Sequence, residues 1–231
     1  MIITEENINA DFRSAEVKSL RDEADIICTN PPFSLFRDFL AWINPDEKKF
    51  LILSNMNAIT YKEVFPLIRD NRVWLGASIH SGGISFYMPD GSLKELGCIR
   101  WFTNMRHRFR YEHLNLLTKA ELEQQGVVYH KYDNYDAIEV PKTKLIPADY
   151  DGVMGVPISF LDKYNPDQFS IVAFRRGEDG KDLAYTIESE RVQPYFRVLI
   201  SSTAIAGLLN NPKDTRVNGI SKYARILIQN K

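Results

Sequence analysis

The stretch ADIICTNPPFSLF, residues 24–36, decides the fold of the amino-terminal part of this chain. Ile26-Ile27-Cys28-Thr29 is a short apolar, mostly β-branched run that is typical of a strand. Asn30-Pro31-Pro32-Phe33 follows, and neither proline has an N–H with which to continue a ladder of hydrogen bonds. Apolar residues then recur at helical spacing, and Ser34 is positioned to cap a helix. The stretch therefore predicts a strand, a rigid turn and a helix.

The same alternation continues outward from this stretch. Ser14 is positioned to cap a preceding helix, and Phe50–Leu53 and Val73–Leu75 read as further buried strands. Tyr61–Arg69 reads as the helix between them, with a possible kink at Pro66. This order of strands and helices predicts an α/β fold with a parallel, doubly wound sheet and right-handed crossovers.

The pattern changes after the third strand. Ile84–Met88 and Cys98–Thr103, on either side of the turn Pro89–Ser92, predict an antiparallel hairpin added to the sheet. Beyond Asn104 the periodicity weakens into short extended pieces between turns, which favours a smaller α+β module. The extended pieces are Ala137–Val140, Phe169–Phe174, Tyr195–Ser201 and Ala224–Ile228. We therefore expect a first domain over residues 1–104 and a second over residues 105–231.

Composition excludes several classes of protein. The 231 residues carry a net charge of −1, so a nucleic acid would have to be met by a local basic patch. The two cysteines form no zinc spacing or disulfide framework, and the acidic segments YDNYDAIEV and ADYDGV lack the spacing of a calcium loop. We predict no metal site. The first residues do not resemble a signal peptide and no apolar run is long enough to span a membrane, so we expect a cytoplasmic protein.

The Asn-Pro-Pro-Phe turn has a specific chemical capacity. Ligands of open α/β sheets bind beyond the carboxyl ends of the strands, where Asn30 lies. The Asn30 side-chain carbonyl and the Pro31 backbone carbonyl are two acceptors in a rigid turn, which suits an exocyclic NH2 group on a conjugated ring. Phe33 offers a flat face for that ring. The alternative is a plain turn without function.

Six blocks of sequence, in order, resemble the EcoRI-type adenine-specific DNA methyltransferases over almost the whole chain. They are DFRS at 11–14, ADIICTNPPFSLFRDFL at 24–40, NMNAITYKEVFPLI at 55–68, IRWFTN at 99–104, YDNYDAIEV at 132–140 and DYDGVMGVPISFLDKYNP at 149–166. The resemblance implies a partial Rossmann-like methyltransferase sheet. It also implies methyl transfer from S-adenosylmethionine to the N6 amino group of adenine in double-stranded DNA, as in restriction–modification systems, on a base flipped out of the duplex.

The resemblance assigns roles to the residues of the target-base site. Asn30 and Pro31 would grip the target amine, and Phe33 would stack on the flipped base. Trp101 or Phe102 matches the position of a second stacking aromatic. The alternative for both is a place in the core, and because neighbours on a strand point to opposite faces, at most one of them serves.

The resemblance also assigns a cofactor site. Asp11 would accept from the amino group of the cofactor's adenine and Phe12 would pack on its ring; the alternative for Asp11 is a helix cap. Pro32 and Asn30 would line the pocket beside the methyl donor. The family's Gly-rich turn is missing, since the first glycine of the chain is Gly76. We therefore expect a C-terminal piece of a longer enzyme, a truncated product, or one of two chains that together complete the cofactor site.

Five arginines are candidates for DNA contact. Arg106, Arg108 and Arg110 would share one side of the segment MRHRFRYEH if that segment is extended, and such a strip suits phosphate groups. Arg175 and Arg176 are weaker candidates in the second domain, for which the resemblance implies target recognition. The alternative for the strip is an ordinary solvated face.

Three functions stay open at this point. The first is an adenine-N6 DNA methyltransferase or its catalytic fragment. The second is a DNA-binding remnant without a cofactor site. The third is a methyltransferase for RNA or for a protein glutamine amide, since an Asn-Pro-Pro-aromatic turn also serves those substrates.

Overall fold

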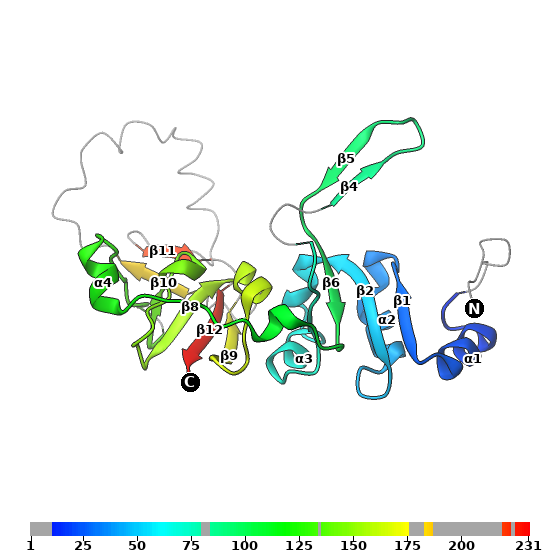
Figure 1. Ribbon diagram of the computed structural model, residues 1–231, viewed down its shortest axis with the longest axis horizontal. Helices are drawn as coiled ribbons and strands as arrows, with labels where there is room; N and C mark the ends of the chain where they lie inside the picture. The colour runs from blue at the N-terminus through cyan, green and yellow to red at the C-terminus, as the bar shows by residue number, and fades with distance from the viewer. Residues whose placement is uncertain (1–10, 80–83, 134, 176–182, 187–218, 223–224) are drawn as a thin grey trace. The chain divides into compact units, whose positions relative to one another are not determined.

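The computed structural model describes residues 11–79, 84–133, 135–175, 183–186, 219–222 and 225–231 (Figure 1). The chain divides into two compact units. The first unit comprises Met1–Leu114, Ser159–Ser170 and Lys231, and the second comprises Asn115–Ile158 and Ile171–Asn230. The expected domain boundary at residue 104 thus lies inside the first unit, which also takes in a later segment. Tyr195–Ser201, predicted to be extended, lies outside the described residues.

A four-stranded sheet forms the centre of the first unit, in the order β1-β2-β6-β3. β1 (Ile26–Thr29) pairs in parallel with β2 (Lys49–Asn55), while β6 (Ile99–Thr103) pairs antiparallel with both β2 and β3 (Trp74–Leu75). β3 therefore runs in the same direction as β1 and β2, although it is bonded to neither. The chain is a mixed α/β protein, and the three strands predicted to be parallel do share one direction.

The predicted hairpin is wrong in its second strand. β4 (Ile84–Tyr87) pairs instead with β5 (Leu93–Leu96) in a separate two-stranded sheet, which we call the ribbon. A short turn at Gly97-Cys98 follows, and β6 then enters the main sheet between β2 and β3. The predicted turn at residues 89–92 is confirmed, because Gly91 has φ +80° and its N–H donates to the Met88 carbonyl at 2.9 Å.

Helices cover the sheet with apolar side chains at helical spacing. α2 (Phe36–Ile43) buries Phe36, Phe39, Leu40 and Ile43, and Phe36 lies against Phe102 of β6 with ring centroids 4.9 Å apart. α2 ends at Asn44, whose φ of +58° stops the helix. Ser34 does not cap α2, because the short 3-10 helix η2 (Phe33–Leu35) intervenes.

Two other predicted helices differ in outcome. α1 (Ala15–Glu23) begins as predicted, and the Ser14 hydroxyl accepts from the Val17 N–H at 3.3 Å. The helix predicted over residues 61–69 is shorter. The 3-10 helix η3 (Met56–Thr60) precedes it and α3 covers only Phe65–Arg69, because Pro66 stands in the first turn, where its missing N–H costs nothing. Pro66 therefore starts this helix and does not kink it.

The second unit contains a four-stranded sheet in the order β7-β8-β12-β9 and a two-stranded sheet. The four-stranded sheet consists of β7 (Ala137–Glu139), β8 (Val153–Pro157), β12 (Arg225–Asn230) and β9 (Phe169–Arg175), and the pair consists of β10 (Leu183–Thr186) and β11 (Gly219–Lys222). α4 (Lys119–Gln124) begins with a capping box between Thr118 and Glu121. The remaining short helices are η4 (Arg108–Tyr111), η5 (Thr143–Leu145) and η6 (Ile158–Lys163).

A buried ionic network stabilises the sheet of the second unit. Glu139 is 3% exposed and accepts from the Arg225 guanidinium at 2.9 Å and from the Tyr132 hydroxyl. Gly155 lies beside the Tyr132 ring, where any Cβ would collide with it. In the part of the chain that the structure describes, no helix is long and apolar enough to cross a membrane.

Candidate target-base site

The Asn-Pro-Pro-Phe turn follows the last residue of β1 directly. Asn30 and Pro32 are exposed, Pro31 is buried, and Phe33 is half-buried at the start of η2. The Pro32 carbonyl accepts from the Leu35 N–H at 2.9 Å, which fixes the exit of the turn into η2. No hydrogen bond between described residues uses the Asn30 side chain or the Pro31 carbonyl. Both acceptors are therefore available to a ligand.

Asp11 and Phe12 lie just before α1. The Asp11 carboxylate is exposed and accepts from the Arg13 backbone N–H at 3.0 Å. The Phe12 ring meets Phe39 and Trp42 of α2 edge to face, at centroid distances of 5.2 and 5.6 Å. Asp11 thus keeps free acceptor capacity for an amino group, while Phe12 packs on α2.

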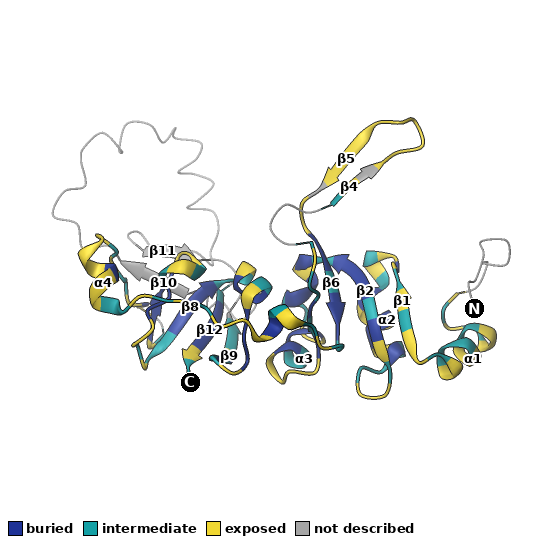
Figure 2. Ribbon diagram, viewed as in Figure 1, coloured by how far each residue is buried: buried dark blue, intermediate teal, exposed yellow. Residues whose placement is uncertain are grey.

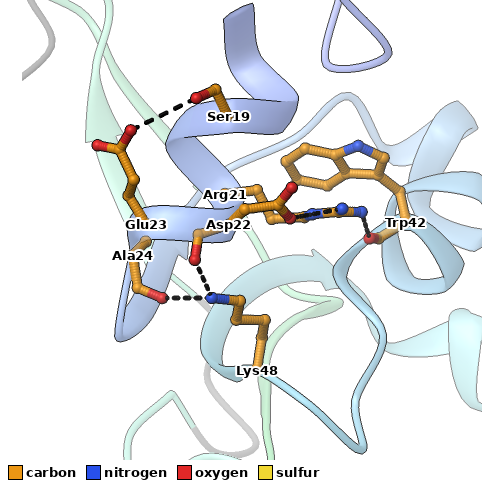
Figure 3. Close-up of polar contacts among 7 residues, drawn as sticks. All are labelled: Ser19, Arg21, Asp22, Glu23, Ala24, Trp42 and Lys48. Carbon is orange, nitrogen blue, oxygen red and sulfur yellow. Dashed lines mark hydrogen bonds and ion pairs between the residues drawn. The ribbon is translucent and has the colours of Figure 1, made fainter. Parts of the chain in front are cut away.

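Figure 3 shows how the carboxyl end of α1 is attached to α2 and to Lys48, which precedes β2. Arg21 donates to the Trp42 backbone carbonyl at 2.7 Å and lies 5.1 Å over the Trp42 ring. Lys48 donates to the backbone carbonyls of Asp22 and Ala24, at 2.6 and 3.0 Å. These cations bind at the carboxyl end of the helix, where they also favour its dipole. α1 is therefore held against the residues that lead into β2.

The two candidate stacking aromatics have different environments. Phe102 is fully buried against Phe36, so it belongs to the core and is not available to a base. Trp101 points to the opposite face of β6 and is half-buried. It lies over Gly76, where an added Cβ would come within 2.6 Å of the Trp101 Cβ. Of the two, only Trp101 can serve as a stacking residue.

The predicted strip of three arginines does not form. Residues 108–111 make the 3-10 helix η4, so the alternation of an extended segment is lost. Arg110 is 5% exposed, lies 4.2 Å over the Trp74 ring, and donates to the Asn71 side-chain oxygen at 2.7 Å. Burial lowers the pKa of Arg110. Its guanidinium is part of the packing of the first unit and is not accessible to a phosphate group.

Arg106 and Arg108 are exposed, but they follow the end of the sheet opposite to Asn30, where β1 and β2 begin. β6 runs opposite to β1 and β2, with Ile99 beside Asn55 and Thr103 beside Leu51. The chain after Thr103 therefore leaves at the amino ends of β1 and β2, whereas Asn30 follows the carboxyl end of β1. Arg106 lies 5.9 Å over the Tyr111 ring and Arg108 lies 4.5 Å over the Phe109 ring. This placement favours the solvated-face alternative for both.

The arginines of the second unit are located only in part. Arg175 is the last residue of β9, and Arg176 lies outside the described residues.

Sequence reasoning missed two features of the first unit. Arg100 on β6 forms a buried bidentate ion pair with Asp162, with nitrogen–oxygen distances of 2.8 and 3.1 Å. The ribbon exposes large apolar side chains near its turn, with Tyr87 at 82% and Leu93 at 55%. Tyr87 and Leu93 are a usable signal for the ribbon, because they place apolar residues on either side of the predicted turn at residues 89–92.

This chain is similar in sequence to known methyltransferases. The family described as adenine-specific methyltransferase EcoRI matches residues 3–231. The Type II methyltransferase M.EcoRI of Escherichia coli is 45% identical over 84% of this chain and 62% of its own length. M.MpnI of Mycoplasma pneumoniae is 36% identical over 71% of this chain and 56% of its own length. A Type II methyltransferase of Mycoplasma genitalium, M.MgeORF184P, is 32% identical over 96% of this chain and 69% of its own length.

The chain therefore spans about three fifths of the length of the first two of these relatives. No solved structure matches it significantly. Because the family match extends over nearly all of the 231 residues and carries the Asn-Pro-Pro-Phe turn, the chain belongs to the EcoRI family of adenine-specific methyltransferases.

Proposed function

We propose that this chain carries the target-base site of an S-adenosylmethionine-dependent methyltransferase that acts on the N6 amino group of adenine in double-stranded DNA. The observation that carries the proposal is the turn after β1. There, Asn30 is exposed and Pro31 is buried. The Asn30 side-chain oxygen and the Pro31 backbone carbonyl accept no hydrogen bond from any described residue. Membership of the adenine-specific family and the shared direction of β1, β2 and β3 support a partial Rossmann-like methyltransferase sheet.

The two acceptors act on the nitrogen of the target amine. That nitrogen is a weak nucleophile, because its lone pair is delocalised into the ring. When Asn30 and Pro31 accept its two hydrogens, they favour a pyramidal nitrogen whose lone pair is free to attack. The same oxygens stabilise the positive charge that grows on the nitrogen, so no prior deprotonation is required. On attack, the bond between the methyl group and the donor's sulfur would break, and the methylated nitrogen would then lose one of its two protons to solvent. Phe33 stacks on the ring and orients it.

The adenine end of S-adenosylmethionine fits the residues at the start of α1 by the chemistry of their groups. Asp11 has free carboxylate lone pairs for an amino group, and Phe12 is half-buried beside it. The Arg13 guanidinium lies 4.9 Å over the Phe12 ring, so a stacked adenine would share or replace that contact. Asn30 and Pro32 would border the methyl donor, which when bound supplies an electrophilic methyl group. We assign no described residue to the charged methionine end.

The proposal includes two partners. One is double-stranded DNA, with target recognition assigned to the second unit. The other is a polypeptide that supplies a Gly-rich turn, either as part of the same protein or as a second chain. We call the chain together with that polypeptide the active form.

Substitution of Asn30 tests the catalytic assignment. Asn30→Ala in the active form should abolish methyl transfer while DNA affinity stays within a few-fold, because an interaction made mainly in the transition state affects turnover more than binding. Asn30→Asp, which retains an acceptor oxygen, should keep part of the rate. The measurement is transfer of a tritiated methyl group to DNA, RNA and protein, assayed side by side.

The alternatives predict other outcomes of the same assay. Transfer to RNA or protein in preference to DNA would replace the proposed substrate. DNA binding without transfer by the active form would favour a non-catalytic remnant. An unchanged rate for Asn30→Ala would remove the turn from the mechanism.

A further inference from the structure

The ribbon, β4 with β5, exposes apolar side chains that the fold itself does not need. Tyr87 is 82% exposed, Leu93 55% and Met88 39% (Figure 2). Tyr87 and Leu93 are directly paired across the two strands, and Met88 follows at the turn. A two-stranded ribbon is marginally stable alone in water, and exposed apolar groups gathered at one place commonly mark a binding site. We call these three side chains the ribbon tip, and their exposure indicates a binding site.

The ribbon tip is held in a defined shape by its turn. The Asp90 carboxylate accepts from the Ser92 N–H at 2.9 Å and from the Ser92 hydroxyl at 2.6 Å. The Met88 N–H donates to the Ser92 carbonyl at 2.8 Å, which closes the turn. The hydrogen bond from Ser92 lowers the pKa of Asp90, so the carboxylate stays ionised and the turn stays closed at neutral pH. The tip is thus pre-formed before any partner binds.

The ribbon joins the sheet at the carboxyl ends of β1 and β2, where the target-base site also lies. β6 begins at Ile99 beside Asn55, which is the carboxyl end of β2, and the Met56 N–H donates to the Cys98 carbonyl at 2.6 Å. β1 is parallel to β2, so Asn30 follows the carboxyl end of β1 at that edge. By its register, Asn30 is level with Leu53, about two residues or ~7 Å along β2 from the foot of the ribbon.

The chemistry of the ribbon favours bases over phosphates as its ligand. Between Ile84 and Leu96 it carries Asp90, Lys94 and Glu95, so it has one cation and two anions. Attraction to a phosphate backbone requires clustered cations, which the ribbon lacks. A two-stranded ribbon fits the major groove of DNA in width, and Leu, Met and aromatic side chains are used as wedges between stacked bases. An extruded base also leaves stacked neighbours exposed, and these offer an apolar surface.

We propose that the ribbon tip packs against the bases that flank the target adenine and supports its extrusion into the site at Asn30. The proposal rests on the proposed function, because it takes duplex DNA as the substrate. It adds Tyr87, Leu93 and Met88 as positioning residues that act on the duplex and not on the transferred methyl group.

The test compares two ribbon variants of the active form. Tyr87→Ser with Leu93→Ser removes the two most exposed side chains of the ribbon tip, and because both are exposed the fold should be retained. Ser85→Ala is the matched control, because Ser85 is exposed on the same ribbon two residues before Tyr87. The probe is a duplex with 2-aminopurine at the target position, whose fluorescence rises when that base unstacks.

The double variant should lose the fluorescence rise and bind DNA about tenfold more weakly, which is within the range for lost base stacking. The salt dependence of its affinity should not change, because no phosphate contact is removed. Methyl transfer should be restored on a duplex whose target adenine is mispaired, since that base is already partly free. Ser85→Ala should match the unaltered protein in all four measurements.

Three results would overturn the proposal. One is a double variant that keeps the fluorescence rise and the rate on paired DNA. Another is an altered salt slope, which would indicate phosphate contact. The third is a change in sedimentation from dimer to monomer, which would make the tip a contact between two copies of the chain. Failure of the proposed function looks different, because the unaltered protein would then transfer no methyl group to DNA, paired or mispaired.

Discussion

Gly76 is a position where a single methyl group would disturb the sheet beside the candidate site. Its N–H donates to the Trp101 carbonyl at 2.8 Å, and a Cβ at this position would meet the Trp101 Cβ at 2.6 Å. The obstacle is the first atom of the Trp101 side chain, which cannot rotate away. β3 and β6 must therefore shift apart if any side chain is added, and Trp101 would move with β6.

Gly76→Ala is accordingly expected to lower the free energy of unfolding by about 1–3 kcal/mol, the usual cost of overpacking. Urea unfolding followed by tryptophan fluorescence measures this in the first unit alone, because Trp42, Trp74 and Trp101 are the three tryptophans of the chain and all lie there. Gly97→Ala is the control, since no atom lies within 4 Å of its added Cβ. Equal midpoints for the two variants would show that the strands separate without cost.

At the scale of elements, the position of β6 decides which residues can share a ligand with the turn. β6 is antiparallel to β1 and β2. The ribbon, which precedes β6, therefore lies at the carboxyl ends of β1 and β2, and the chain after Thr103 lies at their amino ends. A duplex engaged at Asn30 therefore meets the ribbon before it meets Arg106 or Arg108. Each arginine also already lies over an aromatic ring.

We expect Arg106→Ala with Arg108→Ala to leave DNA affinity and its salt dependence unchanged. The measurement is the dissociation constant at several salt concentrations. If both side chains did contact phosphates, the slope of log affinity against log salt would fall by roughly 0.9 per contact, or about two in all. A fall of that size would show that DNA extends across the sheet from one edge to the other.

The sequence predicts correctly those elements that are determined by neighbouring residues, such as caps, apolar spacing and prolines. Ser14 caps α1, the apolar spacing gives α2, and the two prolines end β1, as the sequence indicates. The strand with which β6 pairs is not determined by neighbouring residues. Its pairing with β2 is set by contacts more than forty residues away, so the nearest antiparallel candidate, β4, was the wrong choice. Arg110 shows the same limit, because its burial follows from Trp74 and Asn71 and not from its own neighbours.

At the scale of the whole molecule, β1 stands at the end of its sheet. Among the described residues only β2 pairs with it, and Ile26 is 51% exposed while Cys28 is exposed as well. An unpaired strand edge is a template for another strand. The proposed cofactor residues Asp11 and Phe12 lie just before α1, the helix that leads into β1.

The chain of residues 1–231 alone should bind S-adenosylmethionine very weakly and should not methylate DNA. In the proposed site, Asp11 and Phe12 would contact only the adenine end of the cofactor, and its charged methionine end would remain in water. Isothermal titration of S-adenosylmethionine into the chain measures this directly. Adding a polypeptide with the Gly-rich turn should raise the affinity, because a completed pocket is better pre-organised.

An Asp11→Ala variant is the matched control for that titration, since loss of the acceptor oxygens should remove the gain seen with the added polypeptide. Micromolar affinity together with methylation by the lone chain would contradict the expectation.

The ion pair between Arg100 and Asp162 has a consequence for how the protein is made. The two residues are 62 positions apart, and their side chains are 4% and 8% exposed. A ribosome adds about 5–20 residues per second, so the guanidinium of a nascent chain waits roughly 3–12 s for its carboxylate to be synthesised. Until then, burial of Arg100 would leave a charge without its counter-ion, which is strongly unfavourable. The first unit must therefore close after translation has passed the first β-strands of the second.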